Sequence, residues 1–321
     1  MIEARELTKK YGDKVAVDRL SFTVRPGIVT GFLGPNGAGK STTMRLILGL
    51  DRPTSGSVTI DGKPYAAHRE PLKVAGALLE ARAVHTSRSA YNHLLALATT
   101  HGISRSRVDE VIDFVGLDGV ARKRAGAFSL GMGQRLGIAS AILADPTNLL
   151  LDEPVNGLDP EGILWIRSLL KELAAQGRTV FVSSHLMSEM ALTAEHVIVV
   201  GRGRLMADTS MADLIATSSS GAVLVTTPQA DALATALTAP GIEIVRRTLE
   251  QLEVHGATAP EVGAVAARIG AILHKLTAQQ ASLEQAFMDM TKDEVEYHGQ
   301  DLSTKDTNDP NNTTDTNRSA A

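Results

Sequence analysis

The chain has 321 residues, of which 43% are hydrophobic and 21% charged, so it is long enough for two globular domains. Its net charge of −4 excludes strong attraction to nucleic acid or to an anionic membrane, and the absence of cysteine excludes disulfides and thiolate sites. The sequence shows neither a signal-peptide core nor an uncharged apolar run of about 18 residues, so we expect any membrane-spanning part to come from another chain.

Short strands are predicted first along the chain. Residues 2–11 and 15–24 alternate well enough between apolar and polar side chains to form strands. Gly27–Leu33 is apolar and β-branched, which indicates a buried strand. Residues 57–60 form another predicted strand, before a turn at Asp61 and Gly62.

The stretch directly after Leu33, GPNGAGKST, fits the phosphate-binding pattern G-x-x-x-x-G-K-[ST]. Its glycines have no Cβ, so the backbone can take positive φ and approach a phosphate closely. Lys40 would bring a full positive charge to the β- and γ-phosphates, and the Ser41 hydroxyl would bind Mg²⁺. The alternative is a glycine-rich turn that happens to contain a lysine. The predicted nucleotide-binding positions are Gly34, Pro35, Asn36, Gly37, Ala38, Gly39, Lys40, Ser41 and Thr42.

A mostly helical region follows, over residues 85–127. Val108, Val111, Ile112 and Val115 recur at helical spacing, which predicts a helix with one apolar face. Beyond it, in FSLGMGQRLGIASAILADP, we predict a helix that begins at Gln134 and ends before a proline.

Two adjacent carboxylates, Asp152 and Glu153, end the apolar run NLLLDEP. An apolar run bounded by prolines is typical of a buried parallel strand, and ligands bind at the carboxyl edge of such sheets. Adjacent acids also occur by chance on surfaces. Combined with a phosphate-binding loop, however, this pair indicates a functional site.

Alternating helices and strands continue to about residue 205. Gly162–Gly177 is predicted as an amphipathic helix, and Thr179–His185 as an apolar strand that ends in two serines and a histidine. Taken alone, His185 would more often be structural than catalytic. His196–Leu205 gives one more strand and a turn. This alternation predicts an α/β fold with a largely parallel sheet.

The composition changes near TSSSG, residues 217–221, which we interpret as a linker. The order that follows is βαββαβ, which predicts a small ferredoxin-like α+β domain over 222–298, including a last helix at 282–291. From 299 to 321 the chain is rich in Asp, Asn, Thr and Ser, so we expect a disordered tail.

The order of motifs resembles the nucleotide-binding subunit of an ABC transporter. The phosphate-binding loop is followed by FSLGMGQ, a degenerate form of the family's LSGGQ signature, then by LLLDEPVNGLDP and SSH. NGLDPEGI and SSHLMSE resemble the ATPase subunits of bacterial drug and antibiotic exporters of the bacitracin and daunorubicin type. This resemblance implies a P-loop ATPase domain over 1–216, with a helical subdomain at about 83–145.

The resemblance also assigns roles to individual residues. It implies that Tyr11 stacks on adenine, although a lone strand-end tyrosine can equally have no role. It implies catalytic roles for Lys40, for Glu153 as general base and for His185 as a sensor of the γ-phosphate, and it implies magnesium ligation by Ser41 and Asp152. It implies that Asp159 lies at a dimer contact, and that Ser129 and Gly131 reach the nucleotide of the opposite subunit.

Two features depart from the family pattern. The signature has Leu130 and Met132 where Gly and Gln are usual. Glu80 stands in place of the glutamine that touches magnesium and the membrane partner; it keeps an acceptor but lacks the amide donor. Glu80 is therefore a candidate magnesium contact, and the alternative is a solvent-facing acid.

One phosphate-binding loop and one signature in each chain imply a head-to-tail homodimer that closes on ATP and Mg²⁺. The resemblance implies an integral membrane permease as partner, no nucleic acid, and a cytoplasmic location on the inner face of the cell membrane. The expected function is to power export of a drug, antibiotic peptide or lipid. The alternatives are a soluble ABC-type ATPase acting on nucleic acid or ribosomes and a non-hydrolysing protein that sequesters an antibiotic.

Overall fold

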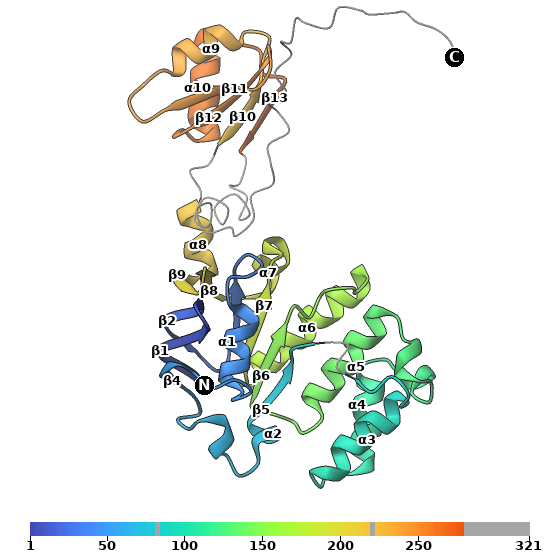
Figure 1. Cartoon of the computed structure of the whole chain (residues 1–321). Coiled ribbons are helices and arrows are strands. Elements are labelled where there is room, and N and C mark those ends of the chain that lie inside the picture. The colour runs from blue at the N-terminus through green and yellow to red at the C-terminus, as the bar shows by residue number, and fades with distance from the viewer. Residues whose placement is uncertain (81–83, 219–221, 279–321) are drawn as a thin grey trace, which may run out of the picture.

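A computed structural model describes residues 1–80, 84–218 and 222–278 (Figure 1). A six-stranded sheet with the order β5-β6-β7-β3-β8-β9 forms the centre of the larger unit. Its strands are parallel, except that β9 runs antiparallel to β8. The predicted largely parallel sheet is therefore confirmed. The strands are β3 (Val29–Leu33), β5 (Ala75–Leu78), β6 (Asn148–Asp152), β7 (Thr179–Ser184), β8 (His196–Gly201) and β9 (Arg204–Ser210).

A second, antiparallel sheet of three strands has the order β2-β1-β4. The helix α1 (Lys40–Ile47) packs with this sheet and with one face of the six-stranded sheet in a single apolar core. At its centre Phe32 lies 5.0 Å from Phe181 and 5.9 Å from Phe22, measured between ring centroids. The core therefore holds the helix that follows the phosphate-binding loop. The strands are β1 (Ile2–Tyr11), β2 (Lys14–Val24) and β4 (Ser55–Ile60).

The other face of the six-stranded sheet packs against helices in a second core. Three of them, α3, α4 and α5, are grouped together in Figure 1 and correspond to the predicted helical subdomain. No helix within the described ranges is long and apolar enough to cross a membrane. The helices of the larger unit, with α1 already given, are α2 (Pro71–Val74), α3 (Ala90–Thr100), α4 (Arg105–Phe114), α5 (Leu130–Ile142), α6 (Pro160–Ala175), α7 (Met187–Thr193) and α8 (Met211–Ser218).

The predicted start of α5 at Gln134 is wrong, because the helix begins at Leu130. The Ser129 hydroxyl accepts a hydrogen bond from the Met132 amide at 3.2 Å and caps the helix. The glycines that suggested a loop therefore lie inside the first turn. Similarly, Asp159 caps α6 by accepting from the Gly162 amide at 3.0 Å, so that helix begins earlier than predicted.

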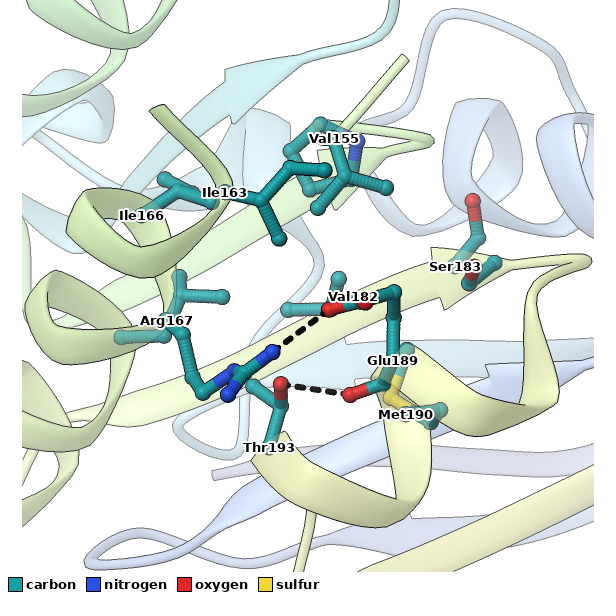
Figure 2. Close-up of a pocket in the computed structure, with 12 residues that line it drawn as sticks. Val155, Ile163, Ile166, Arg167, Val182, Ser183, Glu189, Met190 and Thr193 are labelled. Carbon is teal, nitrogen blue, oxygen red and sulfur yellow. Dashed lines mark hydrogen bonds and ion pairs between the residues drawn. The ribbon is translucent and has the colours of Figure 1, made fainter. Parts of the chain in front are cut away.

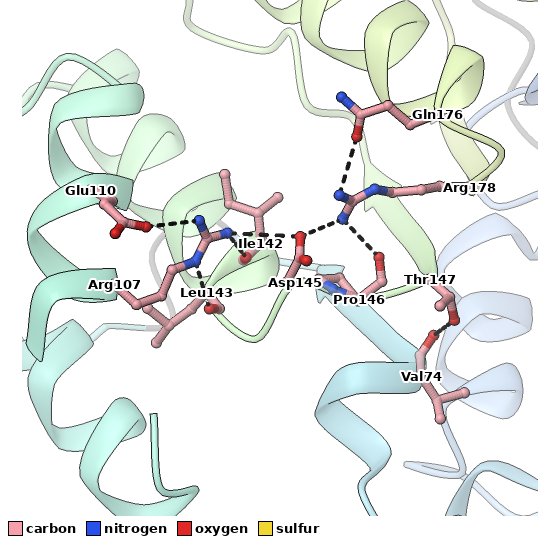
Figure 3. A network of polar contacts seen from close by, with 10 residues as sticks. All are labelled: Val74, Arg107, Glu110, Ile142, Leu143, Asp145, Pro146, Thr147, Gln176 and Arg178. Atoms are coloured by element: carbon pink, nitrogen blue, oxygen red, sulfur yellow. Dashed lines mark hydrogen bonds and ion pairs between the residues drawn. The ribbon is translucent and has the colours of Figure 1, made fainter. Parts of the chain in front are cut away.

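Polar contacts join the helical subdomain to the central sheet below α5 (Figure 3). Arg107 on α4 donates to the carbonyl oxygens of Ile142 and Leu143, which close α5, at 3.2 and 3.3 Å. It also lies 3.9 Å from Asp145, which in turn accepts from Arg178 at 2.7 Å, just before β7. The Asp145 carboxylate thus bridges two arginines that belong to the two parts of the larger unit.

The C-terminal unit has its own core. Its strands pair antiparallel in the order β11-β12-β10-β13, which is the ferredoxin-like arrangement predicted from the βαββαβ order. The predicted helix at 282–291 and the predicted tail at 299–321 lie outside the described residues. The elements are β10 (Val223–Thr226), α9 (Ala230–Leu237), β11 (Glu243–Arg246), β12 (Gln251–His255), α10 (Ala259–Ile269) and β13 (Lys275–Ala278).

Candidate functional site

The predicted phosphate-binding loop connects the end of β3 to the start of α1. Gly39, the residue before α1, has φ +98°, in the left-handed region that favours glycine. A Cβ at Gly39 would lie only 2.4 Å from the carbonyl oxygen of Ala16 on β2. The glycine is therefore required both by its conformation and by the close approach of the neighbouring strand. The loop ends at the N-terminus of an eight-residue helix, whose first amides favour an anion.

Lys40 opens that helix, and its side chain is 7% exposed. Its ammonium donates to the carbonyl oxygens of Gly34 at 2.6 Å and Pro35 at 3.3 Å. Burial lowers the pKa of Lys40, while the negative charges of Glu153 and Asp152 oppose that shift. A buried lysine that folds back onto the loop is placed to neutralise phosphate oxygens bound there.

The two predicted carboxylates come together with Ser183 near the end of β7 and with His185, which follows that strand. The Ser183 hydroxyl donates to the Asp152 carboxylate and accepts from the Glu153 amide at 3.0 Å. The Glu153 carboxylate has one oxygen 3.8 Å from the Lys40 ammonium and the other 2.8 Å from Nδ1 of His185. The adjacent parallel strands β6 and β7 therefore bring both acids and His185 to one edge of the sheet, beside the lysine.

The backbone of Glu153 is in an unusual conformation, with φ +50°. Its carbonyl oxygen accepts a hydrogen bond of 3.0 Å from the side-chain amide of Gln134, which is only 3% exposed. Gln134 and Ser183 thus hold the backbone on both sides of the Glu153 side chain. Neither residue was predicted from the sequence motifs. The signal that could have found Gln134 is an amide group among apolar residues of a predicted helix.

The signature residues Ser129 and Gly131 lie at the start of α5, in the helical subdomain. The Ser129 side chain caps its own helix, and a Cβ on Gly131 would lie 3.1 Å from the Gly157 carbonyl oxygen. Leu130 is 45% exposed and packs against Gly157, where a Cβ would lie 2.1 Å from the leucine side chain. The unusual leucine is thus accommodated by a glycine in the loop before Asp159. This leaves Ser129 exposed at a helix N-terminus.

Two further predicted positions lie on exposed surface. Tyr11 is 47% exposed, and its hydroxyl donates to Asp51 at 2.9 Å. Glu80 is exposed and follows β5, which pairs in parallel with β6 so that Leu78 is opposite Leu151. Glu80 and Glu153 each stand two residues beyond these partners, so both follow the same edge of the sheet.

An apolar cavity lies behind the Asp152–Ser183 edge, between α6, α7 and β7 (Figure 2). On its wall Arg167 of α6 donates to Glu189 of α7 at 2.7 Å. The two helices begin just after Asp159 and His185, respectively. This ion pair therefore joins the helices that follow two of the predicted functional residues.

The oxygen-bearing side chains predicted as metal ligands suit a hard divalent cation. Asp152 supplies a carboxylate, Ser41 an exposed hydroxyl, and Glu80 a second carboxylate at the same sheet edge. Mg²⁺ prefers oxygen ligands of this kind, usually one or two carboxylates together with phosphate oxygens and water. Asp152 and Ser41 therefore carry oxygen donors of the kind that Mg²⁺ prefers.

Known proteins resemble this chain in both units. A family model described as ABC transporter matches residues 17–156, and one described only as a domain of unknown function matches 221–284. The bacitracin transport ATP-binding protein of Bacillus licheniformis is 44% identical over 209 residues, which are 64% of this chain and 68% of that protein. The lantibiotic transport ATP-binding protein of Streptococcus pyogenes is 35% identical over 206 residues, 64% and 89% of the two chains.

A solved structure shares the fold of the larger unit. It is a dimer of the ATP-binding cassette MJ0796 in a post-hydrolysis state, bound to ADP and Pi. It matches with a TM-score of 0.60 and 26% identity, over 66% of this chain and 99% of that one.

Proposed function

Because this chain belongs to the ABC transporter family, as one of its ATP-binding subunits, we propose that it powers export of a peptide antibiotic or drug through a separate membrane permease. The observation that carries the proposal is the meeting of Lys40, Glu153 and His185 at one sheet edge, beside the phosphate-binding loop. Phosphoryl transfer needs positioned charge more than covalent chemistry, and this arrangement supplies charge of both signs.

In the proposed reaction, water attacks the γ-phosphorus of ATP, and the bond from that phosphorus to the β–γ bridging oxygen breaks. Glu153 accepts the proton of the attacking water, and ADP and phosphate leave. Lys40 neutralises charge on the β- and γ-phosphate oxygens. His185, hydrogen-bonded to Glu153, holds the carboxylate and contacts the γ-phosphate. The remaining loop positions, from Gly34 to Thr42, hold the phosphates through their backbone amides, apart from that of Pro35.

Asp152 and Ser41 would hold the magnesium that accompanies ATP, and Glu80 is a third candidate contact. Magnesium would neutralise phosphate charge. Ser183 keeps the Asp152 carboxylate oriented by donating to it. A carboxylate with one of its oxygens already accepting a hydrogen bond has fewer orientations available, which favours a fixed contact over a mobile one.

The working unit is proposed to be a head-to-tail pair of chains. Ser129 and Gly131 lie on the helical subdomain and contact their own helix and the loop before Asp159. The proposal therefore places the nucleotide of one chain against Ser129 of the other, with Asp159 at the contact. The post-hydrolysis cassette described above is a dimer, which supports the pairing of two chains.

The proposed cargo and cellular location both depend on the membrane permease with which the chain would work. The two curated relatives described above transport bacitracin and a lantibiotic, so a peptide antibiotic is the first candidate, ahead of other drugs or a lipid. The chain is proposed to act in the cytoplasm, where ATP is available, and to attach to the inner face of the membrane through the permease. The helical subdomain is the proposed docking surface.

The test is export in cells. The chain is co-expressed with a permease of about six apolar 20-residue segments encoded beside it, in a host sensitive to bacitracin and to a lantibiotic. Resistance to one of these agents is expected with the parent chain and not with the Glu153→Gln variant. Equal sensitivity in both strains to both agents, with the two proteins co-purifying, would contradict an antibiotic cargo. If purified chain showed no ATPase activity, the enzymatic proposal would also be wrong.

A further inference from the structure

The exposed ring of Tyr11 is held at its tip by a chain of polar contacts. The Tyr11 hydroxyl donates to the Asp51 carboxylate at 2.9 Å. The same carboxylate accepts from Nε of Arg45 at 2.7 Å and from its second guanidinium nitrogen at 3.4 Å. Arg45 lies in the last turn of α1, the helix that begins at Lys40. The tyrosine at the end of β1 is thus tied to the helix that carries the phosphate-binding lysine.

One face of the ring is also occupied. The Lys9 ammonium lies 4.7 Å from the centroid of the Tyr11 ring, within cation–π range. Lys9 is itself fixed, because it donates to the carbonyl oxygen of Arg52 at 2.8 Å. The Tyr11 side chain is nevertheless 47% exposed, so a ring that is held at its hydroxyl and has a cation over one face can offer its other face to a planar ligand.

The strand pairing brings this ring toward the loop. Tyr11 is paired with Lys14 across the β1–β2 turn. Two residues further along β2, the Ala16 carbonyl oxygen is the atom that a Cβ on Gly39 would meet at 2.4 Å. The hairpin that carries Tyr11 therefore rests on the loop that would hold the phosphates, about 7 Å along β2 from the partner of Tyr11.

The ionisation states of Asp51 and Tyr11 favour the hydrogen bond between them. The hydrogen bond from Arg45 lowers the pKa of Asp51, so the carboxylate is ionised at neutral pH. Partial burial and the bond to Asp51 raise the pKa of the Tyr11 hydroxyl, so it keeps its proton and remains a donor. A neutral hydroxyl that donates to an ion-paired carboxylate makes a charge-assisted hydrogen bond, which is stronger than a neutral one.

We propose that Asp51, held by Arg45, is a positioning residue that fixes the Tyr11 ring as the platform for the nucleoside base. This rests on the proposed function, in which the chain binds ATP and Tyr11 stacks on adenine. Without the anchor the tyrosine side chain would rotate among its staggered states, and binding ATP would have to order it. Asp51 would then act only on ligands that carry a base.

The experiment compares two ligands by calorimetry: Mg-ATP, which carries a base, and inorganic tripolyphosphate, which does not. The variants are Asp51→Ala, Tyr11→Phe, the double variant and Tyr11→Ala. Glu70→Gln is the matched control, because Glu70 also makes an exposed ion pair, to Lys73 at 2.7 Å, but lies outside the loop and the hairpin.

The expected result is that Asp51→Ala and Tyr11→Phe each weaken Mg-ATP binding by about three- to tenfold, since each removes a hydrogen bond to a charged group. Tripolyphosphate binding stays at the parent value. The double variant should be no weaker than either single variant, because both remove the same contact. Glu70→Gln should bind both ligands as the parent does.

Three outcomes would overturn the proposal. Equal weakening of both ligands by Asp51→Ala would show that Asp51 merely supports α1. Weakening by Tyr11→Ala but not by Asp51→Ala would show that the platform needs no anchor, and the ATP site would stand. If Tyr11→Ala bound ATP as the parent does, Tyr11 would have no base-stacking role. The ATPase proposal would not be affected by that result, because its tests are the Lys40 and Glu153 variants.

Discussion

Nδ1 of His185 lies 2.8 Å from Oε2 of Glu153. The other oxygen of the same carboxylate faces the Lys40 ammonium at 3.8 Å. The Glu153 carboxylate therefore lies beside both the Lys40 ammonium and the His185 imidazole. This relationship makes Glu153 the residue whose replacement is most informative.

Glu153→Gln should abolish turnover and preserve binding. The amide keeps the size of the side chain but cannot accept the proton of water, so the rate of ATP hydrolysis should fall by about a hundredfold or more. ATP should then hold two chains together, and light scattering should show a dimer with Mg-ATP and a monomer with Mg-ADP. Parent-like turnover would refute the assignment of Glu153 as the base.

Mixing two defective chains tests whether a site is shared between subunits. Lys40→Met removes the lysine of the phosphate-binding loop, and Ser129→Arg blocks the signature; each variant alone should be inactive. In a mixed head-to-tail dimer one site carries both defects and the other carries neither. An equal mixture should therefore regain about a quarter of parent ATPase activity if the sites act independently. No recovery, with mixed dimers shown by mass spectrometry, would contradict the shared site.

Lys40→Met should also stabilise the chain in the absence of nucleotide. Burial lowers the pKa of Lys40 below its ordinary value of 10.5, so this lysine costs folding stability at every pH below 10.5, neutral pH included. The expected result is a higher Tm for the variant without ATP, and an ATP-induced rise in Tm for the parent only. At 100 times Kd that rise corresponds to about 2.7 kcal/mol. A lower Tm of the nucleotide-free variant would show that the pairing with Glu153 outweighs burial.

Arg107→Met should loosen the helical subdomain. The variant loses two hydrogen bonds to the end of α5 and the contact with Asp145, and it leaves two carbonyl groups with poorer partners. We expect a loss of about 1–2 kcal/mol in the free energy of unfolding, measured in urea. Lys73→Met is the control, because Lys73 makes an exposed ion pair with Glu70, and its effect should be much smaller. Equal effects would show that the network in Figure 3 contributes nothing beyond surface charge.

Glu253 gives the C-terminal unit a pH dependence. The hydrogen bond from Arg247 lowers the pKa of Glu253 below its ordinary value of 4.5, and His255 lies 3.2 Å away. The stabilisation is therefore present above pH 4.5 and is lost as the pH falls through the lowered pKa. Glu253→Gln should reduce protection of β12 amides from hydrogen exchange at pH 7, and the difference from the parent should shrink toward pH 3. A constant difference would exclude this ion pair as the cause.

Sequence patterns predicted the larger unit well where strands are buried. The apolar runs at Val29–Leu33, Asn148–Asp152 and Thr179–Ser184 became three neighbouring parallel strands, because a strand buried on both faces is a nearly continuous apolar run in the sequence. The separate three-stranded sheet was not predicted. Alternation shows that a segment is a strand, but it does not identify the partner strand, and β1 pairs with both β2 and β4 across irregular registers.

Sequence motifs singled out the charged side chains that the structure brings together, but not the residues that support them. Lys40, Asp152 and Glu153 belong to short motifs whose spacing identifies them. Gln134 and Ser183 do not, because their contacts with Glu153 arise only when α5 and β7 pack beside β6. The hydrogen bond between Tyr11 and Asp51 was missed for the same reason, since it joins residues 40 positions apart.

The left-handed backbone at Glu153 is energetically unfavourable for a glutamate. Glycine takes such an angle freely, and for glutamate it costs roughly 1–3 kcal/mol. Glycine or asparagine at this position would ease folding and leave no group to take a proton from water. The residue proposed as the general base therefore has a strained backbone, so selection for stability alone would favour replacing it and losing the proposed activity.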